Sequence, residues 1–221
     1  MLYPLKLNAA FKDYLWGGTR LRDEFNKQTD IDPVAESWEL SCHHDGQSII
    51  SNGEFSGKTL AQYIETVGKQ VIGTKAPKDK DFPILIKFID AKESLSVQVH
   101  PDDKYALLHE GESGKTEMWY VMDATPDATL IYGFTHNISH QEFERRIKDN
   151  TLLEVCNQVP IKKGDVFFIE AGTLHAIGAG ALIAEIQQSS NSTYRVYDYG
   201  RVGKDGKLRE LHIEKALAVT K

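Results

Sequence analysis

Hydrophobic residues in the second part of the chain recur in short runs rather than at helical spacing. From residue 84 onward, runs rich in Val, Ile, Phe and Tyr are separated by Gly, Asp, Asn and Pro, a pattern typical of strands joined by turns. Many short strands without long intervening helices favour a sandwich or a small barrel. The strands predicted in this way are 84–90, 94–100, 116–123, 128–132, 165–170, 181–187 and 193–198.

Three segments have helical patterns instead. Thr59 and Gln62 form a capping box ahead of apolar residues at helical spacing, and Ser139 with Glu142 repeats this pattern. Pro101 and the two aspartates after it are typical of a helix start. No linker or repeat divides the chain, so we expect one domain spanning 1–221, with helical insertions at about 59–72, 101–108 and 139–150.

The composition is that of an ordinary folded protein and limits its partners. Of the 221 residues, 41% are hydrophobic and 26% are charged, and the formal net charge is −6. This balance provides no basic surface for nucleic acid, and no apolar run approaches the roughly 20 residues that cross a bilayer. We therefore expect a cytoplasmic protein with neither a nucleic-acid nor a membrane partner. Cys42 and Cys156 are too few to cross-link a domain of this size and are expected to be free thiols.

Two of the predicted strands carry polar residues where a metal ion could bind. The strand that ends at His100 alternates strictly, so Ser96, Gln98 and His100 share one face. An ordinary half-exposed strand has the same pattern. Glu117, however, lies among large apolar residues, where burying an unpaired carboxylate is costly and a cation would remove that cost.

A further histidine completes a possible donor set. His175 follows an apolar run and a Gly-containing turn, a position that is also typical of a buried structural histidine. Together, Gln98, His100, Glu117 and His175 offer two nitrogens, a carboxylate and a carboxamide oxygen, which suit Zn²⁺ or another borderline divalent ion. Because only the glutamate carries charge, such a site stays near +1 and keeps Lewis acidity toward a substrate oxygen.

The motifs around these residues resemble a known family. Gln98-x-His100 followed by Glu117, and Gly164-x5-Glu170-Ala-Gly-x2-His175, resemble the two metal-binding motifs of the cupin superfamily, with Gln98 and Glu170 where His and Pro are usual. Longer segments narrow the likeness to the type I mannose-6-phosphate isomerase family in its short bacterial form. They are Trp16-Gly-Gly, Ala35-Glu-Ser-Trp-Glu-Leu-Ser41, Phe82-Pro-Ile-Leu-Ile-Lys-Phe-Ile-Asp90, Gly114-Lys-Thr-Glu-Met-Trp-Tyr120 and Tyr194-Arg-Val-Tyr-Asp198.

The resemblance implies a mainly β fold, a cupin-type antiparallel jelly-roll barrel with a few accessory helices. It implies a metal-dependent isomerase that interconverts mannose 6-phosphate and fructose 6-phosphate through an enediol, with one zinc ion per chain. Short family members continue into a further β-rich C-terminal region, so the resemblance also implies that this chain is a shortened version without it. The implied zinc ligands are Gln98, His100, Glu117 and His175.

The resemblance also implies roles for other residues. Arg195 and Glu185 match catalytic positions, with Glu185 as the leading proton-transfer group, and its apolar neighbours are expected to raise its pKa. Lys87, Lys115 and Ser96 match positions that contact substrate and are expected to hold the phosphate or nearby hydroxyls. Two alternatives stay open: a non-catalytic cupin that binds a sugar phosphate, and an iron-dependent cupin oxygenase, in which Gln98 would fill a position that O₂ needs.

Overall fold

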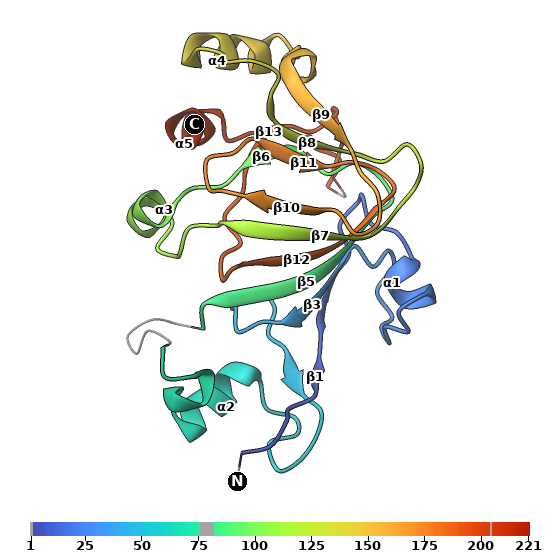
Figure 1. Ribbon diagram of the computed structural model, residues 1–221, viewed down its shortest axis with the longest axis vertical. Helices are drawn as coiled ribbons and strands as arrows, with labels where there is room; N and C mark the ends of the chain where they lie inside the picture. Colours follow the sequence, from blue (N-terminus) through green and yellow to red (C-terminus); the bar gives the residue numbers. More distant parts are fainter. Residues whose placement is uncertain (1, 76–81, 204) are drawn as a thin grey trace.

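The computed structural model describes residues 2–75, 82–203 and 205–221 and consists mainly of two antiparallel β-sheets (Figure 1). This confirms the expected mainly β class with accessory helices, although hydrogen bonds among the described residues do not join the two large sheets into one closed barrel. The six-stranded sheet has the order β10 (Val166–Ile169), β7 (Glu117–Ala124), β12 (Ala181–Gln188), β5 (Ile84–Ala91), β3 (Glu36–Leu40), β2 (Ala10–Lys12).

The second sheet has five strands and packs against the first. Its order is β13 (Tyr194–Tyr197), β6 (Val97–Val99), β11 (His175–Ile177), β8 (Thr129–Phe134), β9 (Cys156–Pro160). A separate pair is formed by β1 (Leu7–Asn8) and β4 (Ile49–Ile50).

The main core lies between the two large sheets. Trp119 and Ile183 from the six-stranded sheet pack in one cluster with Leu130 and Ile177 from the five-stranded sheet, and all four are at most 2% exposed. Burying each such side chain contributes roughly 1.5–3 kcal/mol relative to its exposed state. The sheets are therefore held together by apolar packing, and the polar residues described below are enclosed at the edge of this core.

The helices confirm the capping signals but are shorter than expected. In α2 (Leu60–Val67), Thr59 and Gln62 form both bonds of the capping box. The predicted 59–72 segment is interrupted at Gly68, whose φ of 100° does not continue a helix, and a 3-10 turn follows at η1 (Lys69–Ile72). Ser139 caps α4 (His140–Lys148).

The third predicted helix begins later than expected. Asp102 is the N-cap of α3 (Asp103–His109), because its side chain accepts the Tyr105 amide, so Pro101 lies outside the helix. The sequence pattern did not predict α1 (Arg20–Asp23), η2 (Leu152–Val155) or α5 (Ile213–Val219). Among the described residues, neither Cys42 nor Cys156 takes part in a disulfide bond. Among the described residues, no helix has the length and hydropathy that crossing a membrane requires.

Candidate metal centre and substrate cavity

Three of the four predicted metal ligands converge between the two sheets. His100 follows β6, His175 begins β11 in the same sheet, and Glu117 begins β7 in the opposite sheet. The Nε2 atoms of the histidines are 3.1 Å apart, and Glu117 oxygens lie 3.6 Å from His100 Nε2 and 3.5 Å from His175 Nε2. All three residues are at most 1% exposed. One ion could therefore contact all three side chains.

Hydrogen bonds to the far side of each imidazole orient the two rings. His100 Nδ1 lies 2.8 Å from the Ser192 carbonyl oxygen, and His175 Nδ1 lies 2.8 Å from that of Thr173. A carbonyl only accepts hydrogen bonds, so each Nδ1 carries the proton and each Nε2 lone pair faces the triad. Burial lowers the pKa of His175 to about 4 and also holds the pKa of His100 well below its ordinary value. Both rings are thus neutral and able to bind a metal.

The chemistry of this donor set fits a divalent cation. Burial and the nearby Glu185 raise the pKa of Glu117, and the neighbours of its carboxylate oxygens are the two imidazole Nε2 atoms and the Lys115 ammonium. Lys115 Nζ lies 2.9 Å from Glu117 Oε2 and 3.0 Å from His100 Nε2. A buried carboxylate facing two lone pairs is expensive unless positive charge lies among them. The residues present therefore fit a bound metal ion.

Gln98 lies beside the triad, but its side chain contacts Ser96 rather than the three ligands. Its Cα is paired with those of His175 in β11 and Arg195 in β13. Its Oε1 accepts a hydrogen bond from Ser96 Oγ at 3.3 Å. The structure thus gathers His100, Glu117 and His175 and places Gln98 next to them, so the fourth ligand stays a prediction.

Glu185 forms a second charged cluster with the two predicted substrate lysines. Glu185 in β12 and Lys87 in β5 are direct cross-strand partners, and Lys87 Nζ lies 3.1 Å from Glu185 Oε1. Lys115 Nζ lies 3.9 Å from the same oxygen, while Trp119 Nε1 donates to Glu185 Oε2 at 2.7 Å. Glu185 is 3% exposed, which agrees with the expectation that it has a partner.

The expected direction of the Glu185 pKa shift is wrong. Burial alone would raise this pKa, as its apolar neighbours suggested. The positive charges of Lys87 and Lys115, with the Trp119 hydrogen bond, outweigh burial and bring the pKa down to about 2. Glu185 is therefore ionised at neutral pH.

Sequence reasoning missed Glu36, which shares Lys87 with Glu185. Glu36 Oε2 lies 3.5 Å from Lys87 Nζ and accepts a 2.6 Å hydrogen bond from Trp38 Nε1. Glu36 is 6% exposed and also lines the cavity that contains Lys87 and Glu185. A usable signal was present, because alternation along 35–41 places Glu36 and Trp38 on one strand face.

These groups open into a cavity of about 270 Å³. On another part of its lining, Arg195 Nε donates to Ser96 Oγ at 3.3 Å. Arg209, which the sequence analysis did not single out, also lines the cavity and pairs with Asp198. Arg201 pairs with the same carboxylate, so two guanidinium groups share the single charge of Asp198. Arg195 adds a further positive charge to the cavity lining. This excess of positive charge suits an anionic ligand.

Comparisons with known proteins point to one family. A model of the catalytic domain of type I phosphomannose isomerases matches residues 4–127. The probable mannose-6-phosphate isomerase GmuF of Bacillus subtilis is 47% identical over 99% of this chain and 69% of its own length. The mannose-6-phosphate isomerase of Streptococcus mutans is 43% identical over 99% of this chain and 68% of its own length. The crystal structure of the Bacillus subtilis mannose 6-phosphate isomerase covers all of this chain and 69% of that chain, with 41% identity and a TM-score of 0.93.

Proposed function

This chain belongs to the type I phosphomannose isomerase family, and we propose that it interconverts mannose 6-phosphate and fructose 6-phosphate in the cytoplasm. The main observation in support is that the triad, which fits a metal ion, lies next to Glu185. This glutamate is ionised and pairs with lysine side chains. Lys115 links them, since its Nζ lies 2.9 Å from Glu117 and 3.9 Å from Glu185. Aldose–ketose isomerisation needs this combination, a base to move a proton between C1 and C2 and positive charge to stabilise the enediol oxygens.

We propose zinc as the metal, one ion per chain, with His100, Glu117 and His175 as ligands and Gln98 as the fourth. Two neutral imidazoles, one carboxylate and one carboxamide oxygen suit zinc and leave a net positive site. When bound, the ion supplies a Lewis acid that stabilises negative charge on a sugar oxygen. The carbonyl groups of Ser192 and Thr173 support this role by keeping both Nε2 lone pairs directed at the site.

Glu185 is our candidate for the proton-transfer group. Lys87 and Lys115 keep it ionised, so it can accept a proton from the sugar at neutral pH. Trp119 fixes Oε2, which leaves Oε1 on the side of the two lysines. Lys87 and Lys115 are cations within reach of the negative charge that develops when the proton leaves.

The phosphate is best accommodated by Arg195, Arg209 and Ser96. The sequence prediction assigned Lys87 and Lys115 to the phosphate or nearby hydroxyls, but both ammonium groups contact the buried carboxylates described above. The arginine side of the cavity carries the positive excess instead. Binding the phosphate dianion of the substrate there would hold the reacting carbons C1 and C2 in position next to Glu185.

A coupled enzymatic assay that follows fructose 6-phosphate formation tests this proposal. Zinc-loaded protein should convert mannose 6-phosphate, and calorimetry should detect binding of the same substrate. Binding without turnover would contradict an enzyme and favour the non-catalytic sugar-phosphate protein. The oxygenase alternative predicts oxygen consumption by the iron-loaded protein, which we do not expect.

A further inference from the structure

A loop next to the triad is held by one carboxylate that takes no part in the proposed chemistry. The loop comprises residues 189–193 and joins β12 to β13. Glu112, in the segment between α3 and β7, accepts hydrogen bonds on Oε1 from Ser190 Oγ at 3.0 Å, from the Asn191 amide at 3.3 Å and from Ser192 Oγ. Three loop residues are therefore fixed to a single oxygen.

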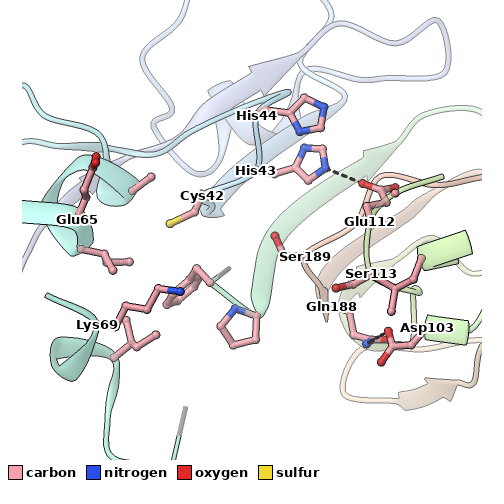
Figure 2. A pocket seen from close by; sticks show the side chains of 17 residues that line it. Cys42, His43, His44, Glu65, Lys69, Asp103, Glu112, Ser113, Gln188 and Ser189 are labelled. Carbon is pink, nitrogen blue, oxygen red and sulfur yellow. Dashed lines mark hydrogen bonds and ion pairs between the residues drawn. The ribbon is translucent and has the colours of Figure 1, made fainter. Parts of the chain in front are cut away.

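The second oxygen of Glu112 has a different partner. His43 Nε2 lies 3.1 Å from Glu112 Oε2, and Figure 2 shows the two side chains directed at one another. His43 Nδ1 accepts the Asp45 amide, so His43 Nε2 carries the proton and donates to Glu112. Both residues line a second cavity of about 780 Å³, on the opposite side of which Glu65 lies in α2. Glu112 thus anchors the loop to the region around β3 and β4.

The loop in turn touches the metal centre. The Ser192 carbonyl accepts from His100 Nδ1 at 2.8 Å, and Asn191 and Thr193 line the substrate cavity. The path from Glu112 through Ser192 to His100 consists of two successive hydrogen bonds. Fixing the Ser192 carbonyl fixes both the tautomer and the orientation of the His100 ring.

We propose that Glu112 is a positioning residue for the metal centre, acting through Ser192 on His100. The proposal rests on the proposed function only in that it takes His100 as a metal ligand. Glutamine cannot replace Glu112 fully, because one of the two carboxylate oxygens becomes an amide nitrogen, which donates hydrogen bonds. On one side this nitrogen would face the hydroxyls and the backbone amide of the loop, and on the other side it would face the His43 N–H. With the amide nitrogen toward the loop, Ser190, Asn191 and Ser192 lose their common acceptor; with it toward His43, the link to the region around β3 and β4 is lost. In either orientation the loop is held less firmly, and the Ser192 carbonyl fixes the His100 tautomer less strictly.

The test compares zinc affinities of purified variants of the whole 221-residue chain by chelator competition. Glu112→Gln should weaken zinc binding roughly 10- to 100-fold, the usual effect of removing such supporting contacts. Glu65→Gln, on the opposite wall of the second cavity, should bind zinc as the wild type does. Glu112→Asp, which keeps the charge, should recover part of the loss. A Glu112→Gln protein with wild-type zinc affinity would overturn the proposal.

Two further measurements separate positioning from general damage. In the metal-free protein, ¹⁵N–¹H correlation spectra should show His100 protonated on Nδ1 in the wild type and a tautomer mixture in Glu112→Gln; an unchanged tautomer would contradict the proposal. Should Glu112→Gln fail to fold, Ser190→Ala with Ser192→Ala removes two of the same hydrogen bonds and must weaken zinc binding. The His100→Ala variant is the reference. If it still binds zinc, the proposed ligand set is wrong. If His100→Ala loses zinc while Glu112→Gln binds it as the wild type does, only the positioning role of Glu112 is refuted.

Discussion

Lys87 and Glu185 are direct cross-strand partners whose charged groups lie 3.1 Å apart in a site where neither side chain is more than 6% exposed. Glu36 shares the same ammonium group. An enclosed ion pair rarely adds net stability over apolar packing, but losing one partner leaves a charge without compensation. We therefore expect this cluster at the edge of the core to serve the chemistry of the site rather than the stability of the fold.

Removing the ammonium group should be costly. Lys87→Met leaves Glu36 and Glu185 enclosed without their shared cation, and we expect the free energy of unfolding to fall by about 3–5 kcal/mol. Urea denaturation measures this loss. The double variant Lys87→Met with Glu185→Gln should recover part of it, because one of the two uncompensated charges is gone. Equal stability of Lys87→Met and the wild type would show that the pair is not enclosed as described.

Neutralising the proposed base should affect turnover without affecting metal binding. Glu185→Gln keeps an oxygen to accept the Trp119 hydrogen bond but cannot accept a proton, so kcat should fall roughly 10²- to 10⁴-fold. Elemental analysis should still find a full equivalent of zinc. Glu170→Gln, a change at an exposed position, is the matched control and should be fully active. A near-normal kcat for Glu185→Gln would remove Glu185 from the chemistry.

The arginine side of the cavity should determine affinity for the phosphate. Replacing Arg209 by Met removes one charge-assisted contact worth about 1.5–3 kcal/mol, which corresponds to an increase in KM for mannose 6-phosphate of roughly 10- to 100-fold. The value of kcat should change much less, because Arg209 does not contact Glu185 or the triad in the contacts described. Arg145→Met, on the exposed surface of α4, is the control. An unchanged KM would place the phosphate elsewhere.

Glu112 should make stability depend on acid pH. Although burial opposes its charge, hydrogen bonds from His43, Ser192 and Ser190 lower the Glu112 pKa from 4.5 to about 2. A carboxyl whose pKa is lower in the folded state contributes stability above pH 4.5, and this contribution is lost as the pH falls toward 2. The difference in unfolding free energy between wild type and Glu112→Gln should therefore shrink between pH 5 and pH 2.5. A difference that stays constant over this range would contradict the assigned hydrogen bonds.

The sequence predicted the parts of the site that one strand or one motif specifies. Alternation in β6 placed Gln98 and His100 on one face, and the apolar surroundings of Glu117 indicated a partner for its charge. The capping residues Thr59 and Ser139 located the starts of α2 and α4, although only Thr59 and Gln62 form a complete capping box. These features are local, so their physical causes are visible in a short stretch of residues.

What the sequence could not predict depends on contacts between distant segments. The low pKa of Glu185 follows from its pairing with Lys87 in another strand, whereas its own neighbours suggested a rise. Glu112 showed no signal, because its partners Ser190 and Ser192 come from a loop far along the chain. Strand β3 alternates, but its place in the sheet follows from its pairing with β5, more than forty residues later in the chain.

The most direct test of the account is a zinc titration of metal-stripped protein in which bound zinc and fructose 6-phosphate formation are measured in the same samples. The rate should rise in proportion to bound zinc and level off at one equivalent per chain. The His175→Ala variant should neither bind the ion tightly nor turn over substrate. His136→Ala, at an exposed histidine, should behave as the wild type. Equal rates in stripped and loaded protein, or no fructose 6-phosphate at any loading, would contradict the account.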